Sequence, residues 1–228
     1  VLLSQSFVLP FAKYARLHDM NRVCVIPNPL TIDSHEFNYI SHTKEKTLLY
    51  VGRLEQYQKR VERVIEVWSL LEAQHKDWHL QIVGDGADRQ RLENYVCQKR
   101  LQRVEFLGFQ NPKPFYKKSS LLILTSEYEG FGLVIIEAMS FGVVPVVYGS
   151  YSAVYDIIED GKDGLIIPKT AEGFNAAVMA ERMARLMASH TDSMDDSLNQ
   201  MALAAIEKSK VYSIEKIYEQ WMGILTGL

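Results

Sequence analysis

The chain has 228 residues, with 25 Lys+Arg, 28 Asp+Glu and 6 His, and its formal net charge is −3. Hydrophobic residues make up 47% and charged residues 23%, which is ordinary globular composition and excludes a disordered or fibrous chain. A chain of this length buries a core without disulfides or metals, and its mildly acidic balance disfavours electrostatic binding to nucleic acid.

The two cysteines, Cys24 and Cys97, lie far apart and have no CxxC or Cys/His spacing. This pattern predicts reduced thiols in a cytosolic protein rather than a disulfide framework or a zinc site. No apolar run approaches the roughly 20 residues that a membrane-spanning helix needs.

Short β-branched runs alternate with longer amphipathic stretches along the chain. Most of these runs are continuously apolar, which is typical of strands covered on both faces of a parallel sheet. The predicted strands are Val23–Ile26, Thr47–Val51, Leu80–Val83, Val104–Leu107, Leu121–Thr125, Val143–Val147 and Gly164–Ile167.

The amphipathic stretches predict helices. In Arg60–Gln74 apolar residues recur every three or four positions and form one stripe. The other predicted helices are Asp88–Arg100, Leu133–Phe141, Ala171–Ser189, 195–209 and Ile214–Leu225, and residues 1–20 favour a short strand followed by a helix. Strand–helix repetition predicts an α/β fold, a doubly wound Rossmann-like parallel sheet with trailing C-terminal helices.

Ligands of such a sheet bind beside the loops at the carboxyl ends of its strands. After Thr47–Val51, Arg53 and Lys59 place two cations just before a helix, which suits a diphosphate; the alternative is a pair of surface cations. After Leu80–Val83, Gly84-Asp85-Gly86 lets the backbone approach a ligand, or forms a tight turn. The sequence contains no G-x-G-x-x-G and no P-loop, which disfavours dinucleotide oxidoreductases and NTPases.

The loop from Ser126 to Gly132 is the most informative. Gly130 and Gly132 precede a predicted helix whose free N–H groups attract an anion. Glu129 is a poor N-cap, so a capping role explains it badly. Glu137 lies eight residues later in an apolar run, where burial is costly unless the carboxylate is hydrogen-bonded. Ligand hydroxyls would supply those bonds, and the alternative is an internal Arg or Lys.

A fourth loop, Tyr148-Gly149-Ser150-Tyr151-Ser152, is small and polar and fits a wall at the rim of the site.

These segments resemble family 4 glycosyltransferases in kind and in order, over roughly residues 23–211. The matching segments are Ile26-Pro27-Asn28-Pro29, Val51-Gly52-Arg53-Leu54 with Lys59, Ile82-Val83-Gly84-Asp85-Gly86, Leu107-Gly108-Phe109, Ser126 to Gly132 with Glu137-Ala138, Gly142 to Val147, and Glu159 to Leu165. The resemblance implies the C-terminal, donor-binding half of a retaining GT-B enzyme of the group 1 type.

The resemblance also implies roles for these residues. Arg53 and Lys59 would hold the donor diphosphate and Glu129 the sugar hydroxyls, and these three form the predicted catalytic set. Glu137 would bind the ribose hydroxyls. The other predicted donor-binding residues are Gly52, Gly84, Gly108, Phe109, Gly130, Phe131, Gly132, Leu133 and Val134.

No D-x-D pair is present to hold a divalent ion, so we expect no metal and no cofactor, with protein cations carrying the charge of the leaving group. The donor would be a nucleoside-diphosphate sugar, with a UDP-sugar favoured, and the acceptor a glycan or a lipid-linked glycan. We expect a cytoplasmic protein, with peripheral contact at the inner face of the cytoplasmic membrane in the intact enzyme.

The two ends of the chain look different from its middle. The chain begins Val1-Leu2 without Met, and we expect residues 1–22 to be a remnant of an N-terminal acceptor domain. Residues 23–211 would form the nucleotide-sugar-binding domain. The apolar helix in 212–228 would pack on the absent half. We therefore expect this chain alone to bind donor without transferring sugar. The alternative is a non-catalytic nucleotide-sugar-binding or assembly module with the same fold.

Overall fold

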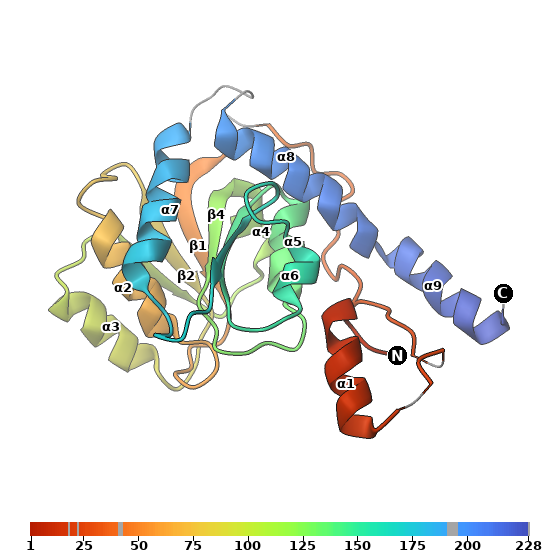
Figure 1. Cartoon of the computed structure of the whole chain (residues 1–228). Coiled ribbons are helices and arrows are strands. Elements are labelled where there is room, and N and C mark those ends of the chain that lie inside the picture. The colour runs from red at the N-terminus through yellow and green to blue at the C-terminus, as the bar shows by residue number, and fades with distance from the viewer. Residues whose placement is uncertain (18, 22, 41–42, 191–195, 228) are drawn as a thin grey trace.

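The computed structural model describes residues 1–17, 19–21, 23–40, 43–190 and 196–227. Its centre is a sheet of six parallel strands in the order β3-β2-β1-β4-β5-β6 (Figure 1). The strands are β1 (Glu45–Val51), β2 (His79–Val83), β3 (Val104–Gly108), β4 (Ser119–Leu124), β5 (Val144–Gly149) and β6 (Leu165–Pro168). The predicted doubly wound α/β fold is confirmed.

Helices cover both faces of the sheet. They are α1 (Val8–Ala15), α2 (Val61–Leu71), α3 (Arg89–Gln98), α4 (Lys113–Lys118), α5 (Leu133–Ser140), α6 (Val154–Ile157), α7 (Ala176–Ser189), α8 (Ser197–Ser209) and α9 (Ile214–Thr226), with 3-10 turns at Gln5–Phe7 and Lys210–Tyr212. Helix α2 packs against α3 and α7 on one face, and α5 packs against α8 on the other (Figure 1).

The core lies between these layers. Every residue of β4 and β5 is buried, which explains their continuous apolar runs. The predicted stripe of α2 is buried too, and its Trp68 is fully enclosed. The other large enclosed rings are Trp78, Tyr50, Tyr116, Tyr148 and Phe141. Each such ring removes roughly 150–250 Å² from water.

The predicted strand Val23–Ile26 is wrong as a member of the sheet. Val25 forms only an isolated bridge with Leu2, outside the six strands. Pro27 and Pro29 follow at once, and proline cannot donate a hydrogen bond to a sheet ladder.

One helix prediction also needs correction, and two helices were missed. Helix α7 begins at Ala176 rather than Ala171, because Gly173 adopts a φ of 87° in a turn and Asn175 caps the helix by accepting from two backbone amides. The short helices α4 and α6 were not predicted. Helix α4 has only six residues and prolines at its start, and these two features obscured the helical pattern.

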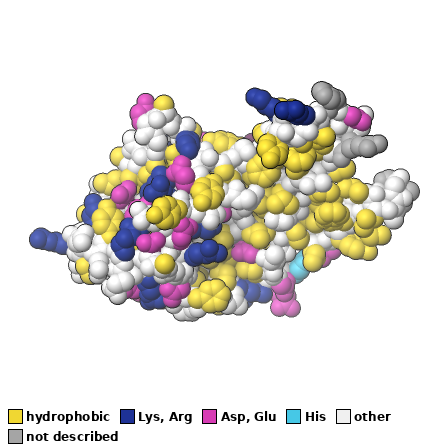
Figure 2. All heavy atoms as spheres, turned by 90° about the horizontal axis from the view of Figure 1, so that it is seen from below, with side chains coloured by type: hydrophobic (Ala, Val, Ile, Leu, Met, Phe, Trp, Pro, Cys, Tyr) yellow, Lys and Arg dark blue, Asp and Glu magenta, His cyan; other side chains and the backbone are white. Residues whose placement is uncertain are grey.

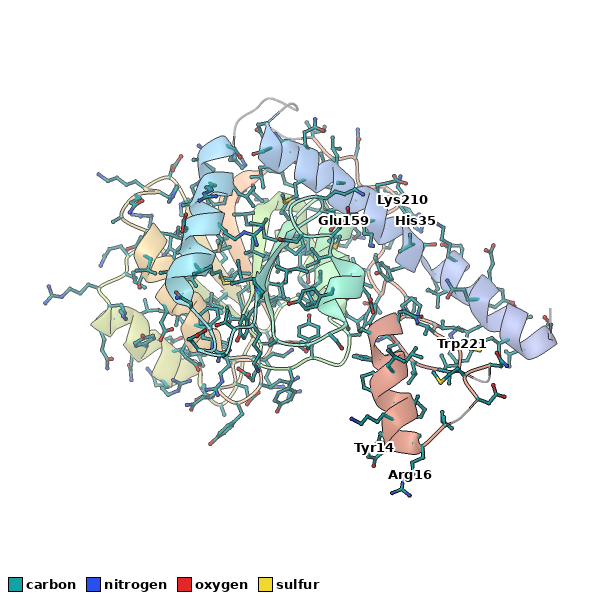
Figure 3. The ribbon with its side chains drawn as sticks, viewed as in Figure 1. Tyr14, Arg16, His35, Glu159, Lys210 and Trp221 are labelled. Carbon is teal, nitrogen blue, oxygen red and sulfur yellow. The ribbon has the colours of Figure 1, made fainter. Side chains whose placement is uncertain are left out.

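Helices α1 and α9 extend away from the sheet (Figure 1). Tyr14 on α1 and Trp221 on α9 lie well clear of it (Figure 3). Hydrophobic side chains gather on this part of the molecule, whereas charged side chains dominate the opposite part (Figure 2). Among the described residues, no helix is both long enough and apolar enough to cross a bilayer.

Candidate functional site

The order of the strands fixes where a ligand can bind. Connections leave β1 toward β2 on one side and β4 toward β5 on the other, so the topological switch point lies between β1 and β4. In open parallel sheets the crevice at this point, outside the carboxyl ends of the strands, is the ordinary ligand site. The loops after β1 and β4 therefore form its two walls.

The loops after β1 and β2 touch each other. Gly84 has a φ of 145°, and a Cβ at this position would collide with the carbonyl group of Gly52. The Gly52 amide donates to the Val83 carbonyl at 3.0 Å, and the Leu54 amide donates to that of Asp85 at 2.9 Å. Glycine thus lets two backbones approach without side chains between them, and the crevice floor is main chain.

The loop after β4 leads into α5 through a glycine. Gly132 is the N-cap of α5, with a φ of 102°, and no side chain caps the helix. The first amides of a helix have no partner within it and carry the positive end of its dipole. The N-terminus of α5 is therefore a potential anion-binding site at the switch point.

Lys59 and Glu129 form an ion pair beside the N-terminus of α5. The Lys59 ammonium donates to Glu129 Oε1 at 2.5 Å, and Ser126 Oγ donates to the same oxygen at 2.7 Å. Lys59 is 22% and Glu129 12% exposed, so both remain reachable from the crevice. The two residues lie on opposite walls, and their ion pair joins them.

A second network of hydrogen bonds and ion pairs holds the loop after β4, and the sequence did not predict it. Arg63 on α2 donates to the Thr125 carbonyl at 3.1 Å and to Glu127 at 2.8 Å, and Lys169 also binds Glu127 at 2.8 Å. The Arg63 guanidinium lies over the rings of Tyr148 and Phe174. On the sequence, Arg63 is one polar position of an amphipathic helix, and its spacing carries no signal of this role.

Two hollows adjoin at the carboxyl edge. One, of about 260 Å³, contains six of the predicted site residues: Lys59, Glu129, Phe131, Gly132, Leu133 and Val134. Asn28, from the segment before β1, lines it as well and had been given no role. The other, of about 550 Å³, contains Gly52, Arg53, Gly84 and Phe109. Val51 lines both hollows, so they lie next to each other at the end of β1.

Arg53 and Phe109 are presented differently from Lys59. The Arg53 guanidinium is exposed and, within the described part of the chain, forms no ion pair or hydrogen bond. Phe109 is 89% exposed beside it. Both side chains are therefore available to a ligand without breaking a contact.

Gly108, Gly130 and Glu137 line neither hollow. Gly108 ends β3 with a φ of 73°, and Gly130 is exposed. Glu137 is 8% exposed on α5 and accepts hydrogen bonds from Thr31 and from Tyr116, the latter at 3.3 Å. Burial raises the pKa of Glu137, and these two bonds partly offset the rise. Among the described residues no Arg or Lys pairs with it, so the alternative of an internal cation is wrong.

The expectation of a polar rim at Tyr148–Ser152 is wrong for its two tyrosines. Tyr148 is 1% and Tyr151 8% exposed, because both rings pack into the core side of the loop. Burial and the nearby Glu129 carboxylate raise the pKa of Tyr151. Ser150 donates to the Ser126 carbonyl at 2.6 Å, so this stretch supports the loop after β4.

A family model described as "Glycosyl transferases group 1" matches residues 32–205. The chain belongs to this family. A glycosyltransferase of Haemophilus influenzae, named as uncharacterized, is 32% identical over 207 residues, which are 90% of this chain and 55% of that protein. An N-acetylgalactosaminyltransferase of Campylobacter jejuni is 27% identical over an alignment with the same coverage. The chain thus spans about half the length of these group 1 relatives.

Solved structures support the same fold. TarM of S. aureus, in a complex that contains UDP, superposes with a TM-score of 0.81 at 25% identity and covers 97% of this chain and 42% of its own. The C-terminal domain of the group 1 protein LpcC from Francisella tularensis superposes with a TM-score of 0.66 at 20% identity, covering 80% of this chain and 99% of that domain. The chain therefore has the fold of the Rossmann-like, C-terminal half of a GT-B group 1 glycosyltransferase.

Proposed function

We propose that this chain binds the donor, a nucleoside-diphosphate sugar with UDP-sugar favoured, for a retaining hexosyltransferase. The observation that carries the proposal is the uncapped N-terminus of α5, which opens at the switch point beside Lys59 and Glu129. An anionic group and a polyhydroxylated group fit such a site together.

The diphosphate is proposed to lie between the two cations and α5. Departure of a nucleoside diphosphate builds negative charge, which Arg53, Lys59 and the amides of Leu133 and Val134 would stabilise. When the donor binds, the Lys59 ammonium must leave the Glu129 carboxylate and pair with a phosphate group instead. The exchange frees the Glu129 carboxylate to accept hydrogen bonds from the sugar hydroxyls, so diphosphate binding and sugar binding would assist each other.

The nucleoside is proposed to fill the larger hollow. Phe109 offers an exposed ring to the base, while the backbone around Gly84 and Gly108 supplies main-chain groups. The ribose would then reach Glu137. Among the described residues no cation pairs with its carboxylate, which keeps unused lone pairs for hydroxyl donors.

The relatives support the acceptor class. The Campylobacter jejuni relative is named for transfer to a glycan on diNAcBac-PP-undecaprenol, and a Salmonella typhimurium relative, 31% identical over 160 residues, is named as a lipopolysaccharide 1,6-galactosyltransferase. We propose a glycan or lipid-linked acceptor of this kind for the intact enzyme, with a cytoplasmic site and peripheral contact with the membrane.

Calorimetric titration with UDP, GDP and ADP tests the donor site. We expect UDP to bind, and Arg53→Gln and Lys59→Met each to weaken it about 10- to 100-fold, because a charge-assisted hydrogen bond contributes roughly 1.5–3 kcal/mol. Lys76→Met, at an exposed lysine before β2 on the opposite edge of the sheet, is the matched control and should bind like the wild type. Absence of binding at millimolar nucleotide, or equal binding by all three variants, would refute the proposal.

A further inference from the structure

The Glu137 carboxylate is held by two neutral hydroxyls that come from distant parts of the chain. Thr31 Oγ1, 106 residues away in sequence, donates to Oε1, and the Tyr116 hydroxyl on α4 donates to Oε2 at 3.3 Å. Burial is the largest influence on its pKa. A carboxylate that accepts from two hydroxyls keeps two or more unused lone pairs.

Glu137 lines neither hollow of the donor site, but it and its partner Tyr116 each lie one helical turn from a residue that does. On α5, Val134 lines the smaller hollow, and Glu137 follows one turn later. On α4, Pro112 lines the larger hollow, and the amide of Tyr116, one turn later, donates to its carbonyl at 3.0 Å. A ligand that fills both hollows would therefore lie about one helical turn from this carboxylate.

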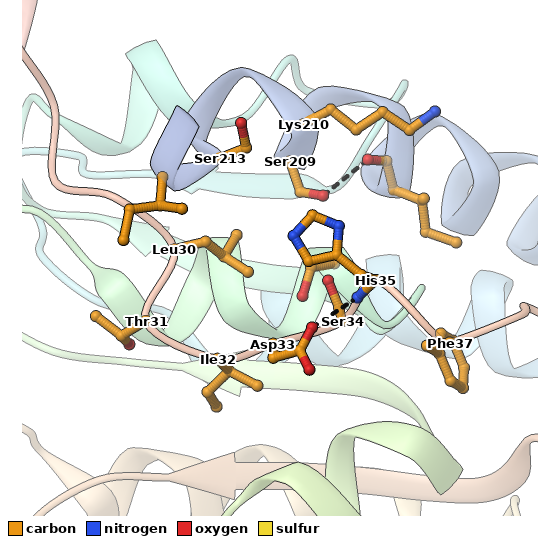
Figure 4. A pocket seen from close by; sticks show the side chains of 13 residues that line it. Leu30, Thr31, Ile32, Asp33, Ser34, His35, Phe37, Ser209, Lys210 and Ser213 are labelled. Atoms are coloured by element: carbon orange, nitrogen blue, oxygen red, sulfur yellow. Dashed lines mark hydrogen bonds between the residues drawn. The ribbon is translucent and has the colours of Figure 1, made fainter. Parts of the chain in front are cut away.

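Thr31 is the exposed member of the group. It belongs to the segment Leu30–Phe37, which runs alongside the end of α8 (Figure 4). The segment is anchored on both sides of Thr31: the Leu30 amide donates to the Tyr212 carbonyl at 2.7 Å, and the Phe37 ring contacts that of Phe141 at 5.1 Å between centroids. The position of the Thr31 hydroxyl is therefore set before any ligand arrives.

A threonine hydroxyl has one hydrogen and two lone pairs. Thr31 gives its hydrogen to Glu137, so both lone pairs of Oγ1 remain free to accept. A ribose presents two adjacent hydroxyls that can both donate. Thr31 and Glu137 are thus two neighbouring acceptors, one neutral and one anionic, matched to the two hydroxyls of one ribose.

We propose that Thr31 is a further donor-binding residue: one ribose hydroxyl of the bound nucleoside diphosphate donates to Glu137 and its neighbour donates to Thr31 Oγ1. This inference rests on the proposed function, because it needs the ribose at Glu137. It assigns to the segment before β1 a direct part in recognising ribonucleotides over deoxyribonucleotides.

The test is a cycle that removes the hydroxyl from the protein and from the ligand in turn. Binding of UDP, 2′-deoxy-UDP and 3′-deoxy-UDP is measured by calorimetry on the wild type, Thr31→Val and Thr31→Ser. Thr170→Val is the matched control, since its hydroxyl binds the Gly173 carbonyl in an exposed turn. Thermal unfolding of each variant without ligand checks folding, which an exposed Thr→Val change should leave intact.

We expect Thr31→Val to weaken UDP about 3- to 10-fold, the range for one neutral hydrogen bond, and Thr31→Ser to restore the affinity. For one of the two deoxy ligands the loss caused by Thr31→Val should disappear, because the bond is already absent. An equal loss for all three ligands would mean that Thr31 only supports Glu137, and would overturn the inference, as would no loss for UDP. A wild type that binds no UDP, or that binds all three ligands equally, would refute the ribose site itself.

Discussion

Glu137 is a residue whose ionisation opposes folding. Burial raises its pKa above the ordinary value of a glutamate, so the folded state holds the proton more tightly than the unfolded state. The stability linked to this shift is present at low pH and is lost as the pH rises through the folded-state pKa. Above the folded-state pKa the buried carboxylate carries a charge whose burial costs free energy, and hydrogen bonds from a ligand would reduce that cost.

We predict that Glu137→Gln stabilises the ligand-free protein at pH 7–8. The amide cannot ionise, so the melting temperature of the variant should exceed that of the wild type, and the gap should close as the pH falls toward 4. Thermal unfolding across this pH range measures the effect. UDP binding should weaken in the same variant by about 10-fold or more, because a hydrogen bond to a charged group is lost. A gap that is constant with pH would contradict the assignment.

At the scale of the element, α5 depends on the residue at its N-cap. Gly132 adopts a φ of 102°, and a Cβ there would lie 2.9 Å from the Tyr151 hydroxyl and 3.0 Å from Ile135 Cδ1. Both the backbone angle and the space thus favour glycine. The first amides of the helix can face the crevice only while this turn holds its shape.

Gly132→Ala should therefore reduce both stability and donor binding. We expect a loss of about 1–3 kcal/mol in the free energy of unfolding, from strain at the positive φ, and a weaker UDP affinity because the amides of α5 shift. Gly130→Ala is the control in the same loop, since a Cβ there meets nothing within 4 Å. Denaturant unfolding and calorimetry on both variants check the result; equal behaviour of the two would contradict it.

The sequence predicted elements best where one physical signal dominated. Continuous apolar runs revealed the six strands of the sheet, and a three-to-four residue stripe revealed α2. The loops at the strand ends were predicted from their glycines and charges, and the structure brings Lys59, Glu129 and the start of α5 into one hollow. These features are local in sequence.

The features that sequence reasoning missed depend on contacts between distant segments. The partners of Glu137 come from Thr31 and Tyr116, and no periodicity links them to α5. Arg63 anchors the loop after β4, although on its own helix it is simply a polar residue. The buried tyrosines of Tyr148–Ser152 were mistaken for a rim because tyrosine suits both environments.

At the scale of the whole molecule, α9 presents an uncovered apolar face. Ile217 is its only buried residue among those described, whereas Tyr218, Trp221 and Leu225 are exposed. A group of large apolar side chains is unusual on an exposed protein surface, and such a group binds hydrophobic dyes.

We predict that Trp221→Glu with Leu225→Glu lowers binding of a hydrophobic dye and leaves the melting temperature nearly unchanged, because neither side chain is buried. Ile217→Ala, on the same helix but 3% exposed, should instead lower the stability by about 2–5 kcal/mol. Dye fluorescence and thermal unfolding distinguish the two. A large drop in melting temperature for the double variant would show that the face is covered.

The ion pair between Lys59 and Glu129 has a consequence for how the protein acquires its site. The two residues are 70 positions apart, and β2 and β3 lie between β1 and β4 in the chain although β1 and β4 are neighbours in the sheet. Parallel pairing over such separations is slow, because the loop closes before the contacts compensate for its entropy. The proposed nucleotide site takes its walls from both halves of the sheet, so recovery of UDP binding during refolding would time the closure of β1 on β4.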